Sequence, residues 1–232
     1  CFSDGIYFNG STARPITDSQ IKNCWILRCS NNVVASESFE TPPLWLSNCQ
    51  RTYVANCTIN LTGTFSNSTP QNAVGCVELD NCTSCLVENV NMYDDWTFGG
   101  VVLNQASFAG SGTVGSIVRN CIYSGATGAP ATGSGAGALA TVGAFCVVYG
   151  TKNIFSNCLV SNCTIDSALV GYFSTLGNGN AQFNTFQDCK VYDNRSTISI
   201  AGFLTNDANN TFVDCSVYGN TAANSMDSFS IQ

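Results

Sequence analysis

Hydrophobic and polar positions recur in one order seven times along the chain. Each copy begins with an apolar residue, carries Asn or Asp at its third position, and ends with Cys or Val. The copies are Ile21–Cys24, Val54–Cys57, Val87–Val90, Val118–Cys121, Phe155–Cys158, Phe186–Cys189 and Phe212–Cys215. The last position advances by 33, 33, 31, 37, 31 and 26 residues. A period of this length is typical of a solenoid, in which each repeat forms one structural unit.

A second apolar or large residue follows each copy at a spacing of two, which is the period of a β-strand with one buried face. These followers are Ile26, Ile59, Met92, Tyr123, Val160, Val191 and Val217. Within each copy the two apolar positions lie three residues apart, which breaks the alternation. The pattern therefore predicts two strands joined by a sharp bend, and Asn suits a bend because it tolerates left-handed backbone angles.

A third short apolar segment, which usually opens with Gly, lies upstream in each repeat. These segments are 5–8, 44–46, 75–79, 100–103, 143–146, 171–173 and 202–204. Three strands per repeat predict an all-β solenoid, a parallel β-helix of about seven coils. An α-solenoid is the main alternative, but Gly, Asn, Ser, Thr and β-branched residues dominate where helix formers would be needed.

The chain resembles the right-handed parallel β-helix superfamily, whose best-known members are pectate lyases and related polysaccharide-active proteins. The resemblance covers nearly all 232 residues and rests on the residues that recur at the bend, which are similar to that superfamily's asparagine ladder. The ladder positions are Asn23, Asn56, Asn89, Asn120 and Asn157, with Asp188 and Asp214 in the last two coils. The resemblance implies a right-handed, single-stranded β-helix, and by itself it implies no activity.

The composition limits which partners and which cellular location are expected. Only 10% of residues are charged, and 15 acidic against 8 basic residues give a net charge of −7, so no basic stripe is present for nucleic acid. The sequence contains no run of about 18 apolar residues, so it does not predict insertion into a membrane. We interpret residues 1–232 as one β-helix domain and as a section of a longer chain, whose segment 225–232 could begin another coil. The expected location is extracellular or on a particle surface.

Cysteine follows the repeat closely. Six of the 14 Cys residues occupy the last position of the pattern, where Val90 takes the seventh place, and Cys49 and Cys82 form a second column at the same 33-residue offset. The six are Cys24, Cys57, Cys121, Cys158, Cys189 and Cys215. Because Val replaces Cys once, these positions are interpreted as small hydrophobic core residues. Disulfides between successive coils are the alternative. Cys82-Thr-Ser-Cys85 is interpreted as a core-packing segment rather than as a zinc or redox site.

Candidate chemistry is concentrated in the third coil, where Glu78, Asp80, Glu88, Asp94 and Asp95 lie close together in the sequence. Glu78 and Asp80 alternate outward from the core, so with Asp94, Asp95 and Trp96 they form a hypothetical Ca²⁺ or glycan patch. The alternative is a solvated acidic face that keeps the rod soluble. No cofactor is expected except Ca²⁺ at this patch.

Three functional classes follow from these observations. The first is a non-catalytic structural or interaction protein: a β-helical rod of a surface appendage, an adhesin-like passenger or a virion component. Its partners would be the remainder of its own chain or neighbouring subunits. A glycan-binding module is the second class. A polysaccharide lyase or glycoside hydrolase is the third class, suggested by the fold alone. It ranks last because the chain has no His and lacks the motifs that the polygalacturonase-like pattern requires.

Overall fold

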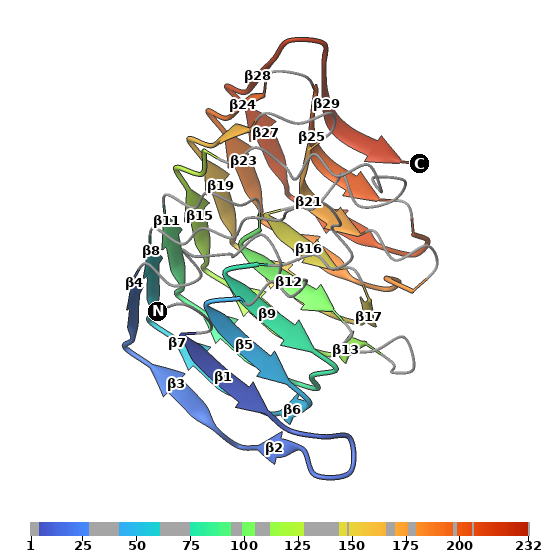
Figure 1. Cartoon of the computed structure of the whole chain (residues 1–232). Helices are drawn as coiled ribbons and strands as arrows, with labels where there is room; N and C mark the ends of the chain where they lie inside the picture. The colour runs from blue at the N-terminus through green and yellow to red at the C-terminus, as the bar shows by residue number, and fades with distance from the viewer. Residues whose placement is uncertain are drawn as a thin grey trace, which may run out of the picture.

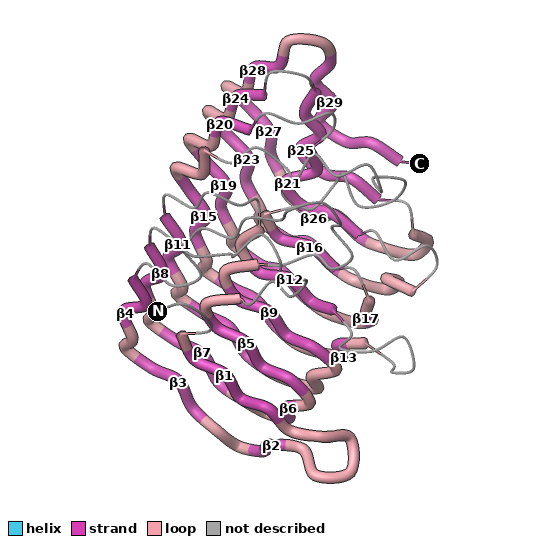
Figure 2. The backbone as a smooth tube through the Cα atoms, viewed as in Figure 1, coloured by secondary structure: helices cyan, strands magenta, loops and turns pink. Residues whose placement is uncertain are grey.

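The computed structural model describes residues 5–27, 42–60, 75–93, 99–104, 112–127, 144–147, 149–165, 170–175, 180–196, 199–205 and 207–231. These residues form short parallel strands joined by turns and bends. Figure 1 shows the strands wound as successive coils, from blue at the N-terminal end to red at the C-terminal end, and Figure 2 shows how the turns connect them. The prediction of an all-β parallel β-helix is confirmed.

Three long sheets run along the rod. Sheet 1 contains β1 (Ile6–Asn9), β5 (Leu44–Ser47), β9 (Val77–Asp80), β12 (Val101–Asn104), β16 (Phe145–Val147), β21 (Val170–Thr175), β25 (Ser199–Thr205) and β29 (Ser225–Ile231). Sheet 2 contains β3 (Gln20–Lys22), β7 (Tyr53–Ala55), β10 (Leu86–Glu88), β14 (Ile117–Arg119), β18 (Ile154–Ser156), β22 (Thr185–Gln187) and β26 (Thr211–Val213). Sheet 3 contains β4 (Trp25–Leu27), β8 (Thr58–Asn60), β11 (Asn91–Tyr93), β15 (Ile122–Ser124), β19 (Leu159–Ser161), β23 (Lys190–Tyr192) and β27 (Ser216–Tyr218).

These sheets match the three predicted strands of each repeat. β29 pairs in parallel with β25, so the segment that could begin another coil does add an eighth strand to sheet 1. Short pairings that the pattern did not predict occupy the corners: β2 (Ile16–Thr17) with β6 (Cys49–Gln50), β13 (Thr113–Val114) with β17 (Gly150–Thr151), and β20 (Thr164–Ile165) with β24 (Arg195–Ser196) and β28 (Thr221–Ala222).

The bend between sheets 2 and 3 has the predicted left-handed backbone. All seven ladder residues have φ between 50° and 57°, including Asp188 and Asp214. Each bend lets the apolar residues on both sides of it point inward, as Val87 and Val90 do with no exposed surface. A side chain that tolerates this conformation is needed once per coil, which explains why Asn or Asp recurs there.

Two aromatic columns run through the interior of the later coils, and one of them ends at Phe229, which is 51% exposed. Phe145, Phe173, Phe203 and Phe229 stack along sheet 1 with ring centroids 5.0, 5.1 and 5.0 Å apart. Phe155, Phe186 and Phe212 stack along sheet 2 at 4.9 and 5.1 Å. Edge-to-face contacts of 5.5–6.2 Å join the two columns. Phe rings of successive coils therefore stack on one another at about the spacing of neighbouring β-strands.

Glycine makes room for this core at Gly202, within β25, and at Gly100, just before β12. A Cβ atom on Gly202 would lie 2.3 Å from Cγ2 of Val217, and one on Gly100 would lie 2.5 Å from the carbonyl oxygen of Ala144. Both contacts are too short for a side chain. The recurrence of Gly in the third predicted segment therefore has a steric cause at these two positions.

The predicted cysteine column is present at the corner after the bend. Cys57, Cys121, Cys158 and Cys189 are buried, whereas Cys24 and Cys215 at the two ends are half-buried, and all six are free thiols in this structure. Backbone bonds such as Leu159 N to Cys121 O, 2.9 Å, keep successive positions in register, and Ile122 N to Val90 O, 3.0 Å, places Val90 in the same column.

Replacing Cys158 with Ala is expected to reduce the free energy of unfolding by about 1–2 kcal/mol, because a small cavity would remain between Cys121 and Cys189. Cys158→Val should cost less, since Val90 already fills one place in the column. Denaturation midpoints of the two variants measure the difference. If Cys158→Val unfolded the rod, the interpretation of the column as hydrophobic packing would be wrong.

Two ladders of buried polar side chains line other corners of the coil. In the first, the Oδ1 atoms of Asn153, Asn184 and Asn210 accept the backbone N–H of the residue one coil earlier, at 2.9, 3.0 and 2.9 Å. In the second, Asn194 and Asn220 accept the N–H of Cys163 and Asn194, each at 2.9 Å. These buried ladders satisfy backbone groups that the corners leave without partners in a sheet.

Candidate functional site

Glu78 and Asp80 project from β9 on the outer face of sheet 1, as the alternation predicted. They do not form an open surface patch, because Glu78 is only 5% exposed and Asp80 only 2%. The same outer face carries a small buried hydrophobic cluster that includes Val102 and Cys146. The expectation of a solvated acidic face is therefore wrong for these two carboxyl groups, since alternation identifies the side of the sheet but not what covers it.

Polar neighbours from the adjoining strands hold the two carboxyl groups. Trp45 on β5 donates its indole N–H to Oδ2 of Asp80 at 2.7 Å, and Asn104 on β12 donates its amide to Oε1 of Glu78 at 3.0 Å. The other oxygen of Asp80, Oδ1, is buried and makes no hydrogen bond. Burial raises the pKa of Asp80 to about 6, although hydrogen bonds from Trp45 and Glu78 act in the opposite direction.

The structure does not test the rest of the predicted patch. Asp94, Asp95 and Trp96 lie outside the described residues. Glu88 lies on β10 in sheet 2, on a different side of the coil from β9. Among the residues that the structure describes, no group of three or more His, Cys, Asp or Glu side chains is placed to hold a metal ion. Calcium binding by the patch stays a prediction.

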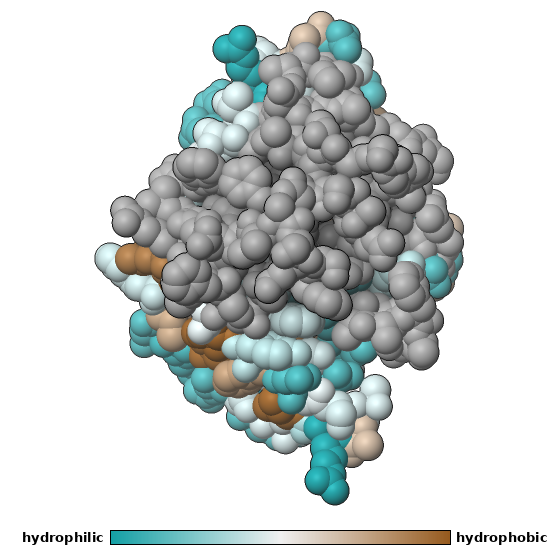
Figure 3. All heavy atoms as spheres, in the orientation of Figure 1, coloured by the Kyte–Doolittle hydropathy of each residue, from teal (hydrophilic) through white to brown (hydrophobic). Residues whose placement is uncertain are grey.

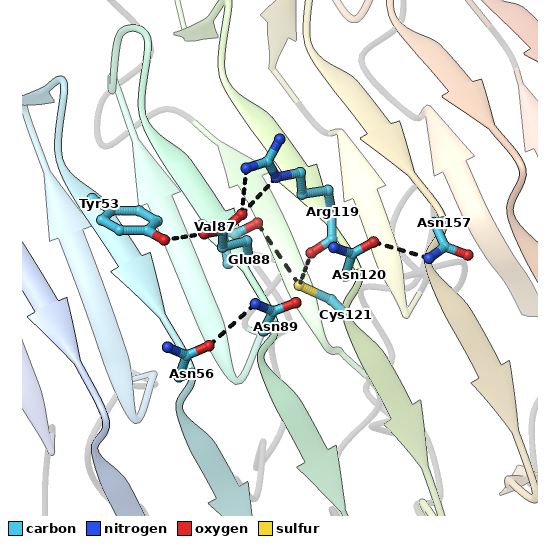
Figure 4. Close-up of polar contacts among 9 residues, drawn as sticks. All are labelled: Tyr53, Asn56, Val87, Glu88, Asn89, Arg119, Asn120, Cys121 and Asn157. Atoms are coloured by element: carbon cyan, nitrogen blue, oxygen red, sulfur yellow. Dashed lines mark hydrogen bonds and ion pairs between the residues drawn. The ribbon is translucent and has the colours of Figure 1, made fainter.

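Glu88 instead joins three coils on the outer face of sheet 2 (Figure 4). Tyr53 on β7 donates its hydroxyl to Oε1, and Arg119 on β14 contacts Oε2 through Nε at 2.6 Å and through Nη2 at 2.5 Å. The ammonium of Lys22 lies 4.5 Å from the centre of the Tyr53 ring. This Tyr53–Glu88–Arg119 cluster was not predicted, although Glu88 and Arg119 occupy equivalent positions in successive repeats; Tyr53 is equivalent to Leu86, two residues before Glu88.

The bonds of the cluster determine the charge of its members. Hydrogen bonds from Tyr53 and Arg119 lower the pKa of Glu88, so its carboxyl group stays ionised. The same bond to Glu88 raises the pKa of Tyr53, so its hydroxyl stays protonated and donates to the carboxylate. The arrangement therefore acts as a clamp between coils.

The ladder asparagines lie beside this clamp and contribute similar bonds. Asn89 donates its amide to Oδ1 of Asn56 at 3.1 Å, and Asn157 donates to Oδ1 of Asn120 at 2.9 Å (Figure 4). These exposed amides therefore bond each other across coils.

Aromatic side chains near the acid pair offer a second kind of surface. The rings of Tyr7 on β1 and Trp45 on β5 stack with centroids 4.4 Å apart and planes inclined by 17°. Tyr7 is 40% exposed, whereas Trp45 is half-buried and bonded to Asp80. In Figure 3, which views the molecule from the same side as Figure 1, brown hydrophobic residues around the first coils stand among white and teal ones. Mixed surface of this kind suits sugars, which present both apolar faces and hydroxyl groups.

The right-handed β-helix region family model matches residues 60–230, which is most of the chain. The chain therefore belongs to the right-handed β-helix family. No curated protein matches the sequence.

Among solved structures, the chain is similar to the crystal structure of an alginate lyase from Paenibacillus sp. str. FPU-7, with 14% sequence identity and a TM-score of 0.28. The alignment covers 99% of this chain and 91% of the lyase. A likeness of this degree adds nothing to the assignment of an activity. No helix long and apolar enough to cross a membrane is found in the part of the chain that the structure describes.

Proposed function

We propose that the chain is a non-catalytic structural or interaction protein: a rigid β-helical rod within a surface appendage, an adhesin-like passenger or a virion component. The observation that carries this proposal is the use of polar side chains to join coils. Asn153, Asn184 and Asn210 do so in the interior, and the Tyr53–Glu88–Arg119 cluster does so outside. Bonds that run along the solenoid axis resist separation of its coils and favour a stiff spacer.

The position of the acid pair supports the same proposal. Two carboxyl groups that catalyse glycoside cleavage must reach a sugar, and a calcium-dependent lyase needs carboxylates open to a metal and a uronate. Glu78 and Asp80 are instead buried and bonded to Asn104 and Trp45. The partners of the rod would be the remainder of its own chain or neighbouring subunits, at an extracellular or particle surface.

Two measurements test the rod proposal. Incubation with alginate, pectate and neutral polysaccharides should release neither unsaturated uronates nor new reducing ends. Immunogold labelling of the native source with an antibody against the folded domain should mark a surface structure or particle. Turnover that disappears in Asp80→Asn would contradict the proposal and move the chain to the polysaccharide-active class.

A glycan-binding module is the second candidate, favoured by the stacked Tyr7–Trp45 pair. A sugar that packs on these rings should change the fluorescence of Trp45. Titration with neutral oligosaccharides should then give a saturable signal that Tyr7→Ala abolishes, while Tyr218→Ala, another exposed tyrosine distant in the coil order, leaves it intact. A signal that survives Tyr7→Ala would exclude this surface as the binding site.

A further inference from the structure

The tripeptide Asn-x-Ser/Thr, which is the acceptor sequence (sequon) for N-linked glycans, occurs eight times in the chain. The asparagines of these sequons are Asn9, Asn56, Asn60, Asn67, Asn81, Asn162, Asn194 and Asn209. The structure describes all three residues of six sequons, whereas those at Asn60 and Asn67 lie partly or wholly outside the described residues. The six share one motif but differ in how the fold uses the Asn side chain.

Asn194 belongs to the interior although its sequon is intact. It is 1% exposed, and its Oδ1 atom accepts the backbone N–H of Cys163 at 2.9 Å. Its Nδ2 atom donates to Val160 O at 3.3 Å, to Tyr192 O at 3.0 Å and to Oδ1 of Asn220 at 2.9 Å. A sugar on this nitrogen would replace one of its two protons and would need room in a packed corner. A glycan at Asn194 is therefore incompatible with the fold.

Three other sequons have a buried Cys at the middle position. They are Asn56-Cys57-Thr58, Asn81-Cys82-Thr83 and Asn162-Cys163-Thr164, and the three cysteines are 1%, 0% and 1% exposed. The three asparagines have φ of 53°, 49° and 55°, because each lies at a bend between strands. A glycosyltransferase must bind the whole tripeptide, and these bends cannot leave the surface without drawing a core thiol out with them.

Asn209 is presented to solvent. It lies in the turn between β25 and β26 with φ of 62°, and its side chain is exposed. Within the described part of the chain its amide makes no hydrogen bond, unlike that of Asn194. Thr211, which supplies the hydroxyl of the sequon, is also exposed, at the start of β26. The turn is held by the residue between them, because the amide of Asn210 donates to Ala181 O at 2.8 Å.

Asn9 is presented in a similar way at the end of β1. Its side chain is exposed, and so is Ser11, the hydroxyl residue of its sequon. Ser11 is held in a tight turn, because its backbone N–H and that of Arg14 each bond to the other's carbonyl oxygen, at 3.1 and 3.0 Å. Asn9 and Asn209 both lie where the chain passes from sheet 1 to sheet 2, in an early and a late coil.

We propose that Asn209 and Asn9 carry N-linked glycans and that Asn194 carries none. The Asn amide nitrogen attacks the anomeric carbon of an oligosaccharide bound to a lipid diphosphate. A C–N bond forms, the C–O bond to the diphosphate breaks, the nitrogen loses one proton to a base of the transferase, and the lipid diphosphate leaves. The inference rests on the extracellular location in the proposed function, because this transfer takes place on the secretory route.

The experiment is secretion of the chain from a glycosylating eukaryotic cell, followed by glycan release with a peptide N-glycosidase and peptide mapping. Release in water labelled with heavy oxygen leaves labelled Asp at each occupied position, which separates it from spontaneous deamidation. Labelled Asp is expected at positions 9 and 209, with unmodified Asn at 194. A folded, secreted chain with unlabelled Asn at 209, or with labelled Asp at 194, would overturn the proposal.

Variants of Thr211 separate glycan transfer from folding, because Asn209 and its turn are retained. Thr211→Ala should abolish occupancy at Asn209, whereas Thr211→Ser, which keeps the hydroxyl, should retain it. Neither change should alter occupancy at Asn9. Asn209→Gly provides an independent check, since Gly tolerates the left-handed turn, and the intact mass should fall by one glycan. Unchanged mass in Asn209→Gly would exclude this site.

The same mapping of the chain from its native source distinguishes failure of the site from failure of the location. Bare Asn at 209 in the secreted chain contradicts the assigned site, whatever the native location. Labelled Asp at 209 in the secreted chain, with bare Asn in the native one, would support the site and contradict the extracellular location of the rod.

Discussion

Replacement of Asn184 by Ala is expected to reduce the free energy of unfolding by about 3–5 kcal/mol, the largest effect of any single substitution considered for this chain. Asn184 has no exposed surface. Its Oδ1 atom accepts the backbone N–H of Asn153 at 3.0 Å, and its amide donates to Gly150 O at 3.2 Å and to Oδ1 of Asn210 at 3.2 Å. Ala would leave the Asn153 N–H buried without an acceptor, in addition to creating a cavity.

Asn120→Gly is the matched control on the exposed asparagine ladder at the bend between sheets 2 and 3. Gly tolerates the left-handed conformation of Asn120, whose φ is 54°, so this variant mainly removes the exposed bond with Asn157. Its cost should stay near 1 kcal/mol or below. Chemical denaturation of both variants, with comparison of midpoints and slopes, provides the measurement. Equal losses in the two variants would show that the buried ladder contributes no more than the exposed one.

The sequence predicts the coil because each inward position recurs at the offsets of the repeat. The Cys column and the ladder bends were found in this way, and their left-handed angles follow from residue type. The buried ladder had an equally clear signal: Asn153, Asn184 and Asn210 advance by 31 and 26 residues, as Cys158, Cys189 and Cys215 do. It was missed because only the bend between sheets 2 and 3 carried a recognised motif.

The candidate site could be predicted only in part. Alternation correctly places Glu78 and Asp80 on the outer face of β9, but a sheet face can be open or covered, and local sequence does not distinguish the two. Glu88, another acidic residue of the third coil, lies on a different sheet from Glu78, because the ten residues between them carry the chain from sheet 1 to sheet 2. Contacts between coils, such as that of Trp45 with Asp80, join residues 35 positions apart.

The second large effect is expected from pH. Burial raises the pKa of Asp80 from 3.8 to about 6, so the native state holds this proton more tightly than the unfolded chain does. Below about pH 4 the carboxyl group is protonated in both states, and its burial as an uncharged group carries no ionisation penalty. As the pH rises from 4 to 6 the unfolded chain ionises first, and the stability contributed by the bound proton is lost. Two pKa units correspond to a loss of about 3 kcal/mol that is complete above pH 6 to 7.

Asp80→Asn isolates this contribution, because its side-chain oxygen can still accept the indole N–H of Trp45 while the group no longer titrates. Denaturation midpoints of the wild type and Asp80→Asn should therefore differ in their pH dependence between pH 4 and 7. Parallel curves would show that Asp80 titrates normally. The difference between the curves also removes the opposing contributions of Asp18 and Glu88, whose pKa values are lowered by partners that the variant retains.

Trp45→Phe tests the cause of the shift. The hydrogen bond from Trp45 lowers the pKa of Asp80 against the larger effect of burial, so its removal should raise this pKa further. The pH range over which stability is lost should then move upward. If the range moved downward, the variant would have admitted water to the outer face of sheet 1, and desolvation would no longer control the carboxyl group. The direction of this one change therefore distinguishes a buried, hydrogen-bonded acid from an accessible one, which is the same distinction that separates a structural rod from a site open to a ligand.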